Sequence, residues 1–284
     1  MFNRRITRRF AAVALSTGIL AFGAFAEEPP LPDLPAFPGP GTSVPEATSG
    51  SLVPVIAKVT AVDAPLNGQA TFVKMLTDAK AAHAKNRDYM GHIVRQERVN
   101  GTLQAEQTGE LRVRNEPFCV SLKLIAPKSL NGWDGIFVTG KFDGKMRLKP
   151  AGTANFTIVP LDSPKVAAYS LHSLADTGLL AVLNRTERIV EIEKKANNPT
   201  QIVAADYTFQ DRAVTRFDIY TERPHPKRFA HHTVLFVDKE THLPVRFEAY
   251  DQPRGAATTG DLIECVSFVN LKFNAGLGDS VFDR

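Results

Sequence analysis

The stretch GELRVRNEPFCVSLKL, residues 109–124, decides the fold class of this 284-residue chain. Apolar residues occupy every second position, first at Leu111 and Val113 and then from Phe118 to Leu124, with polar or small residues between them. A period of two is typical of β-strands whose two faces meet different surroundings. The segment around Pro117 interrupts the alternation and divides the stretch into two strands.

The same alternation continues on both sides of this stretch. Tyr89–Val99 is a strand candidate, and Asn100-Gly101 after it is the strongest short hairpin signal that a sequence offers. The other strand candidates are Asp134–Thr139, Lys145–Lys149, the runs around Tyr207, Phe217, Leu235 and Phe247, and Asp261–Phe273. About ten short strands with hairpin-length connections predict an antiparallel sheet.

Two segments have a helical period instead. In Gln69–Asn86, apolar residues recur at three- and four-residue steps from Phe72 to Ala82, and a second helix is expected over 173–195, with Ser173 or Thr177 as its cap. The predicted fold class is therefore mainly β (α+β), with an antiparallel sheet and two helices.

The two faces of this sheet differ in composition. One carries charged residues of both signs and is predicted to be the solvated outer face, with Arg95, Arg112, Arg114, Arg216, Arg246, Glu97, Glu110, Asp218 and Glu248. The other is aliphatic and aromatic, and is predicted to be the concave face. The residues expected to line it, and to contact any apolar ligand, are Leu111, Val113, Phe118, Val120, Leu122, Phe217, Ile219, Val245 and Phe247.

The first 26 residues have the features of a secretory signal peptide. Four arginines precede the apolar run Ala11–Phe25, and Ala24-Phe25-Ala26 fits a cleavage site after Ala26. A membrane anchor and a twin-arginine signal are the alternatives. Prolines crowd residues 27–66, which predicts a linker, so the predicted division is 1–26, 27–66 and a domain over 67–284. We expect an exported protein of the periplasm or cell envelope.

Charge excludes one large class of partners. The chain has 34 Lys and Arg against 30 Asp and Glu, and four of those arginines lie in the predicted signal peptide. The remainder has no formal net charge, which gives no electrostatic basis for binding nucleic acid.

No catalytic or cofactor motif stands out. The chain lacks a G-x-S-x-G elbow, an H-E-x-x-H pair and a glycine-rich phosphate loop. His231 and His232 are adjacent on a strand candidate, so they point to opposite faces and cannot ligate one metal together. Cys119 and Cys265 are too far apart in sequence for a zinc or redox motif, and either a disulfide or two free thiols remains open. The sequence predicts no catalytic residue, metal or cofactor.

The order of these elements resembles the LolA-like superfamily of periplasmic lipoprotein carriers, in an uncharacterised secreted branch. The resemblance rests on the first helix, VRQERV with its NG turn, GELRVRNEPF, the Asp143-Gly144-Lys145 hairpin, LPVRFEAYDQ and VNLKFNAGLGDSVFD. It implies a strongly curved antiparallel half-barrel with helices over its concave apolar face. In the carriers an arginine before the proline helps to hold the lid closed, and Arg114 is the nearest equivalent here.

Three functions are compatible with these features. The first is binding of a lipid, a lipoprotein acyl chain or another apolar ligand by a protein that we expect to be a monomer. Burial of an acyl chain favours such binding by about 0.8 kcal/mol per methylene. The second is an envelope sensor or interaction protein that binds a protein partner with the same fold. The third is an unrecognised hydrolase.

Overall fold

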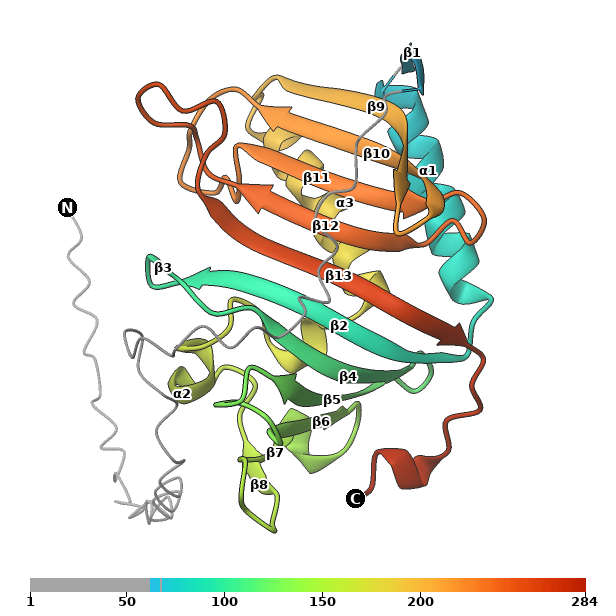
Figure 1. Ribbon diagram of the computed structural model, residues 1–284, viewed down its shortest axis with the longest axis vertical. Coiled ribbons are helices and arrows are strands. Elements are labelled where there is room, and N and C mark those ends of the chain that lie inside the picture. The colour runs from blue at the N-terminus through green and yellow to red at the C-terminus, as the bar shows by residue number, and fades with distance from the viewer. Residues whose placement is uncertain (1–61, 67) are drawn as a thin grey trace, which may run out of the picture. The chain divides into compact units, whose positions relative to one another are not determined.

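The computed structural model describes residues 62–66 and 68–284, all of which belong to one compact unit (Figure 1). The predicted signal peptide and residues 27–61 of the predicted linker lie outside the described residues. Val62–Leu66, which the sequence places in the linker, form strand β1 at an edge of the sheet. Pro65 is tolerated there because one side of an edge strand makes no ladder hydrogen bonds.

A single antiparallel sheet forms the framework. In spatial order its strands run β1-β9-β10-β11-β12-β13-β2-β4-β5-β6-β7-β8, and β3 pairs with β2 outside this path. The bounds are β1 Val62–Leu66, β2 Asp88–Val99, β3 Thr102–Leu103, β4 Gln107–Arg114, β5 Cys119–Ala126, β6 Asp134–Val138, β7 Met146–Lys149, β8 Thr157–Val159, β9 Thr200–Phe209, β10 Arg212–Thr221, β11 His232–Asp238, β12 Pro244–Tyr250 and β13 Leu262–Phe273. The order ends at β1 and β8, so the sheet is open, and the predicted antiparallel half-barrel is confirmed. The strands beyond the predicted ten are short.

Two long helices cover the same face of the sheet, here called the inner face (Figure 1). They are α1, Gly68–Ala84, and α3, Leu179–Lys195. The shorter elements are α2, Pro164–Ala167, and the 3-10 turns η1 Phe142–Gly144, η2 Leu174–Asp176 and η3 Asp279–Val281. Both predicted helices are therefore present, although the second begins later than expected.

Gly178 sets the start of α3. It is the N-cap residue, in place of the expected Ser173 or Thr177, and its φ of 117° and ψ of −178° suit glycine alone. A Cβ at this position would lie 2.4 Å from the Tyr89 hydroxyl, which accepts a hydrogen bond from the Leu179 amide at 2.9 Å. The chain thus turns into α3 directly against strand β2.

The helices fill the inner face over strands β9–β13. The Phe72 ring of α1 meets the edge of the Phe217 ring of β10 at a centroid distance of 5.9 Å. Leu179 and Leu183 of α3 are completely buried in the same cluster. Side chains packed in this way leave few voids larger than a water molecule, so these residues form a packed core.

A different element covers the inner face over β4–β7. Residues 160–177, here called the covering segment, contain α2 and η2 and are otherwise irregular. Val166 and Leu174 of this segment pack against the main core without being fully buried. Pro160 is the first residue of the segment and Pro164 is the first residue of α2, a position at which a helix tolerates proline.

The C-terminal residues pack on the opposite, outer face of the sheet. Phe282 is completely buried in a second cluster with Cys119, Ile136 and Val138 of strands β5 and β6. The tail therefore covers part of the face that the sequence assigned to solvent.

Candidate functional site

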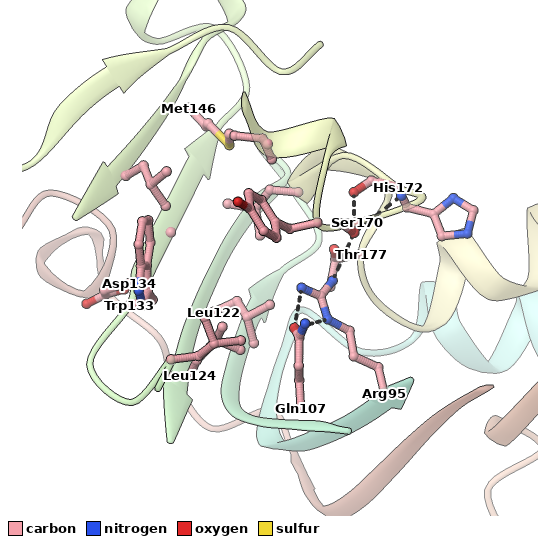
Figure 2. Close-up of a pocket in the computed structure, with 16 residues that line it drawn as sticks. Arg95, Gln107, Leu122, Leu124, Trp133, Asp134, Met146, Ser170, His172 and Thr177 are labelled. Carbon is pink, nitrogen blue, oxygen red and sulfur yellow. Dashed lines mark hydrogen bonds between the residues drawn. The ribbon is translucent and has the colours of Figure 1, made fainter. Parts of the chain in front are cut away.

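A cavity of about 90 Å³ lies between the covering segment and strands β5–β7 (Figure 2). Apolar side chains dominate its lining: Leu122, Leu124, Trp133, Met146 and Leu148 from the sheet side, and Val166, Tyr169 and Leu174 from the covering segment. One water needs about 10–15 Å³ of such space together with polar partners, so this cavity has room for several water-sized groups, but few polar partners for them.

Gly135 of β6 makes room for the covering segment. Its position is paired with Leu122 and Leu148 on the neighbouring strands, and a Cβ here would lie 3.1 Å from the Leu174 side chain. A larger residue would push Leu174 and the covering segment away from the sheet. The glycine therefore determines how closely the segment approaches the sheet.

Arg95 of β2 forms the polar end of the cavity. Its Nε and Nη2 donate to the Gln107 side-chain oxygen at 3.1 and 3.0 Å, and its Nη1 donates to the Ser170 hydroxyl at 3.3 Å (Figure 2). The cavity is thus apolar along its length and cationic at one end.

The position of Arg95 corrects the prediction for two charged residues. Arg95 and Glu97 were expected on the outer face, but they lie on the inner face, opposite Val266 and Glu264 of β13. The alternation along β2 requires this, because Arg95 and Glu97 follow Ile93 at two-residue steps. Arg95, Glu97 and Glu264 on the inner face form hydrogen bonds with the covering segment.

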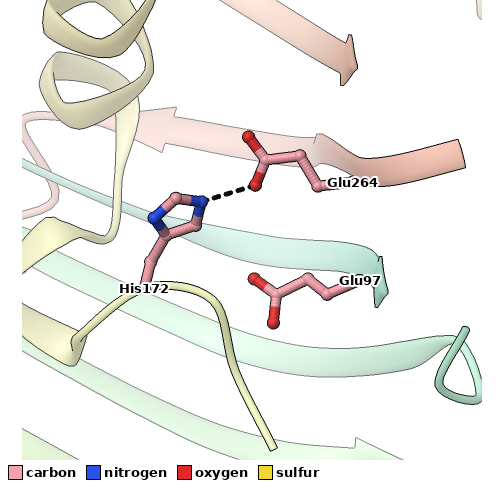
Figure 3. Close-up of side chains that lie close together, drawn as sticks. All are labelled: Glu97, His172 and Glu264. Carbon is pink, nitrogen blue, oxygen red and sulfur yellow. Dashed lines mark hydrogen bonds and ion pairs between the residues drawn. The ribbon is translucent and has the colours of Figure 1, made fainter. Parts of the chain in front are cut away.

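Glu97, His172 and Glu264 form a compact polar cluster beside this end of the cavity (Figure 3). His172 Nε2 lies 2.6 Å from Glu264 Oε2, and Arg185 Nη1 of α3 donates to Glu264 Oε1 at 2.8 Å. Glu97 Oε2 accepts a hydrogen bond from the Leu171 amide at 3.2 Å. Glu97 and Glu264 are only 6% and 2% exposed, so both carboxylates depend on these partners.

The environment of Glu264 favours its charged form. Burial is the largest influence and raises the pKa, but the hydrogen bond with His172 and the charge of Arg185 together outweigh it, so the pKa of Glu264 is lowered. One ligand-type atom from each of Glu97, His172 and Glu264 lies within 4.8 Å of the others, close enough to hold a cation. Arg185 already occupies one Glu264 oxygen and supplies a positive charge there.

The cluster ties the covering segment to the sheet. Ser170, Leu171 and His172 are consecutive, and each contacts a charged side chain of β2 or β13. These residues do not form a nucleophile and base. The Ser170 hydroxyl donates to the main-chain oxygen of His172 at 3.0 Å, while the His172 ring is bonded to Glu264. The contacts of Ser170, Leu171 and His172 with Arg95, Glu97 and Glu264 hold the covering segment against the sheet, and they are here called the clamp.

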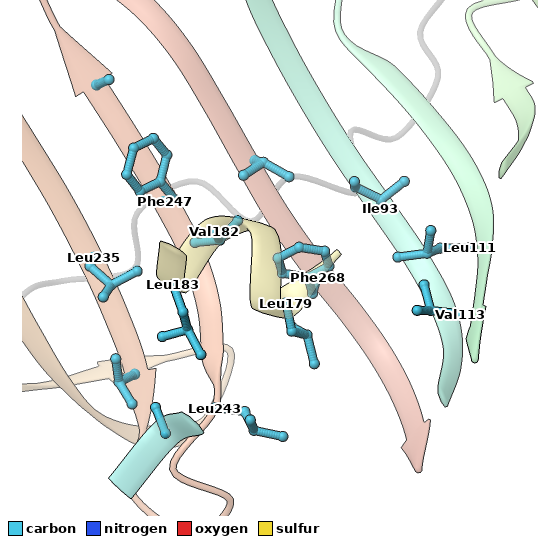
Figure 4. Close-up of a cluster of buried hydrophobic side chains, with 14 of the residues drawn as sticks. Ile93, Leu111, Val113, Leu179, Val182, Leu183, Leu235, Leu243, Phe247 and Phe268 are labelled. Carbon is cyan, nitrogen blue, oxygen red and sulfur yellow. The ribbon is translucent and has the colours of Figure 1, made fainter. Parts of the chain in front are cut away.

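Most residues predicted to line the concave face lie in the inner-face core (Figure 4). Leu111, Val113, Val120, Leu122, Phe217, Ile219 and Phe247 are buried in it, and Phe118 packs against it. Of these only Leu122 lines the cavity. Val245 differs from the prediction, because an irregular register between β11 and β12 places it with Val214, Val234 and Phe236 in a separate cluster.

Arg114, the predicted lid latch, contacts the C-terminal tail. Its Nη1 donates to Asp279 Oδ1 at 2.6 Å and its guanidinium lies over the Phe282 ring at 5.3 Å. It therefore holds the tail on the outer face, away from the covering segment.

The sequence reasoning missed Trp133, Tyr169, Arg95 and His172. Trp133 is the only tryptophan of the chain, which was a usable signal for a pocket. Tyr169 and His172 belong to a stretch without periodicity, where pattern analysis assigns no face. Arg95 could have been placed by extending the alternation from Tyr89.

The cysteines and the remaining histidines have structural surroundings. Cys119 and Cys265 are free thiols, and burial raises the pKa of Cys265 to about 12, so its reactive thiolate is scarce. His231 bonds the main-chain oxygen of Thr221, and His232 bonds Asp218. The Nε2 of His83 is buried without a partner among the described residues, and burial lowers the pKa of His83.

One protein family matches most of the chain. Residues 86–284 match the family described as "Protein of unknown function (DUF1571)". No protein with curated annotation matches the chain. Among residues 62–66 and 68–284, no helix is long and apolar enough to cross a membrane.

Several solved structures resemble the chain. An uncharacterized conserved protein from Thermus thermophilus is 10% identical, with a TM-score of 0.46, over 75% of this chain and 93% of that one. A LolA superfamily protein from Nitrosomonas europaea is 11% identical, with a TM-score of 0.31, over 77% and 98%. The lipoprotein LppX of Mycobacterium tuberculosis is 10% identical, with a TM-score of 0.42, over 74% and 98%. The second of these structures is described as a LolA superfamily protein.

Proposed function

The chain belongs to the family described as "Protein of unknown function (DUF1571)", and we propose that it binds an apolar chain in the cavity beneath its covering segment. The ligand class is a lipid or the acyl chain of an acylated protein, and the protein acts without catalysis. We place this activity in the periplasm or cell envelope, on the basis of the leader-like first 26 residues.

The observation that carries this proposal is the apolar cavity itself. The rest of the inner face is packed by α1 and α3, whereas the cavity lies under a segment with little regular structure. Each methylene moved from water into such a place contributes about 0.8 kcal/mol, so even a short length of chain supplies measurable affinity.

The volume of the cavity determines how a long chain would enter. At about 90 Å³ the cavity is smaller than the roughly 300–1,000 Å³ of sites for drug-sized ligands. A long acyl chain therefore requires the covering segment to move outward. Polar contacts from Arg95, Glu97 and Glu264 hold this segment, and these can break without disrupting the core under α1 and α3.

Trp133 provides a direct test, because the only tryptophan of the chain lines the cavity. Titration with monolauroylglycerol below its critical micelle concentration should change the Trp133 emission saturably, and a brominated chain should quench it. Leu148→Phe, which fills the cavity, should weaken binding about tenfold or more, as expected for the loss of two or more buried methylenes. Ile158→Phe is the matched control, because Ile158 on neighbouring β8 is 47% exposed.

Two results would contradict the proposal. One is a Trp133 signal that does not respond to any single-chain amphiphile. The other is equal binding by Leu148→Phe and the unaltered protein, which would place the ligand elsewhere. In the first case, the protein-partner function becomes the better explanation of the fold.

A further inference from the structure

A second hollow, here called the cationic groove, lies between α3 and the loop of residues 222–231 that joins β10 to β11. Its volume is about 440 Å³. Four of its lining residues are cations, namely Arg185, Arg188, Lys227 and Arg228, and the only carboxylate in the lining is Asp176. Residues 27–284 carry no formal net charge, so this groove is a local concentration of positive charge.

Two of these cations are uncommitted. Arg188 and Lys227 are exposed, and the side chain of neither forms an ion pair or hydrogen bond with any residue in the described part of the chain. The single carboxylate of the groove is already engaged, since Asp176 accepts a hydrogen bond from the Ser173 hydroxyl at 2.7 Å. The groove therefore presents free positive charge to solvent.

Arg228 is the lining residue with the least satisfied hydrogen-bonding groups. Its side chain is only 7% exposed, and its Nη1 is buried with no hydrogen-bond partner among the described residues. Its other contacts are long, 3.4 Å to the Gln252 side chain and 4.0 Å to Asp251. Buried guanidinium groups normally have a close anionic partner, so this one has the capacity to bind another acceptor.

The groove also has an apolar wall. Ile189 and Ile192 of α3 line it together with Phe229 of the loop. A groove with cations and an apolar wall suits the junction between a charged group and a hydrocarbon chain better than it suits a free inorganic ion.

The groove and the cavity meet at His172. This residue borders both hollows, and its ring points away from Trp133 and Met146 in the cavity (Figure 2). Arg185, one of the four cations, bonds the same Glu264 that holds His172. A ligand that extends from one hollow to the other must therefore pass His172.

We infer that the ligand is an anionic amphiphile, whose phosphate group binds in the cationic groove while its chain occupies the apolar cavity. This inference rests on the proposed function and specifies its ligand class. Guanidinium groups form paired hydrogen bonds with phosphate oxygens, and a lysine adds a point charge, so the set Arg188, Lys227 and Arg228 fits a phosphate.

Three probes separate the head group from the chain. Lauroyl lysophosphatidic acid carries both, monolauroylglycerol carries the chain alone, and glycerol 3-phosphate carries the phosphate alone. Binding is measured by calorimetry and by Trp133 emission in the full mature protein. We expect lysophosphatidic acid to bind at least about tenfold more tightly than monolauroylglycerol, and this preference to weaken with added salt.

The double variant Arg188→Glu with Lys227→Glu tests the groove. Both residues are exposed, so the fold is expected to persist, and affinity for lysophosphatidic acid should fall at least about tenfold while monolauroylglycerol is unaffected. The control is Lys85→Glu with Lys128→Glu, which makes the same change in net charge at exposed positions outside the groove. This control should retain the preference for the phosphate.

Each contrary result has a distinct meaning. Equal affinity for lysophosphatidic acid and monolauroylglycerol, or equal losses in the two double variants, would overturn the inference and leave the proposed function standing. Glycerol 3-phosphate binding as tightly as lysophosphatidic acid, without a Trp133 response, would make the groove a separate phosphate site and overturn it as well. No Trp133 response to either chain-bearing probe would overturn the proposed function and the inference together.

Discussion

The inner face of the sheet has two parts that differ in how they are covered. Over β9–β13, two helices of 17 residues each pack on the strands, and residues such as Phe217 and Leu183 are completely buried. Over β4–β7 the cover is the segment 160–177, whose only helical elements are a four-residue helix and a three-residue 3-10 turn. The first part is a core and the second encloses a cavity.

The difference follows from the geometry of the two covers. A long helix presents a side chain to the sheet at every third or fourth residue, and these interdigitate with the strand side chains. The irregular segment cannot supply such a row, and its main chain needs polar partners. Glu97 meets this need at the Leu171 amide, and Arg95 donates to the side-chain hydroxyl of Ser170. A cavity and buried charges therefore occur together.

The largest expected effect is a difference in the free energy of unfolding between variants in the two parts of the inner face. Phe217→Ala removes a ring that is 1% exposed and packed against Phe72, and should lower the free energy of unfolding by about 3–5 kcal/mol. Leu174→Ala in the covering segment should cost less than about 2 kcal/mol, because Leu174 is only partly buried. Chemical denaturation of both variants measures the difference. Equal losses would mean that the covering segment is as much a part of the core as α1 and α3.

The comparison also explains what could be predicted from the sequence. The alternation in residues 109–124 and in the segments around them predicted the antiparallel sheet, and the helical period of Gln69–Asn86 predicted the first helix, because each pattern reports one regular element. The position of the helices over one face of the sheet was implied by the family resemblance. The same rule placed Leu111, Val113 and Phe217 in the inner-face core.

The cavity could not be predicted in this way. Residues that fill a core and residues that line a pocket are of the same types, and only the cover distinguishes Val113 from Leu122. The covering segment has no regular hydrophobic period, so the sequence pattern does not assign Tyr169 or His172 to a face. Val245 was misplaced for a related reason, since an irregularity in pairing shifts the face of a strand residue without any signal in the alternation.

A smaller effect concerns the clamp. Glu264→Gln keeps the shape of the side chain but removes the charge that pairs with Arg185 and His172, and should cost about 1–3 kcal/mol at neutral pH. It should also speed amide exchange at Leu171 and His172. Because the pKa of Glu264 is lowered from its ordinary value of 4.5, the charged form stabilises the protein above that pH. This contribution is lost as pH falls below 4.5 and through the folded-state pKa.

The pH dependence provides the control for this variant. The unaltered protein should lose stability more steeply below pH 4.5 than Glu264→Gln does, because the variant has no carboxyl at this position to protonate. Glu110→Gln is matched, since Glu110 pairs with Arg112 on the outer face at 2.9 Å and is more exposed. It should leave exchange at Leu171 and His172 unchanged. An acid profile of Glu264→Gln identical to that of the unaltered protein would assign the clamp to other groups, such as Glu97.

The smallest expected effect tests whether Arg114 or Arg95 holds the covering segment. Arg114→Ala removes a contact with the tail on the outer face and should lower the Tm by only about 1–3 °C, with amide exchange at Leu171 unchanged. Arg95→Ala should leave the tail in place, but it removes the bonds to Gln107 and Ser170, so exchange in the covering segment should rise and Trp133 should become more accessible to a soluble quencher. If Arg114→Ala instead loosened the covering segment, the two faces of the sheet would be coupled through β4 and β5, and the arginine before the proline would keep the role that the family resemblance implies.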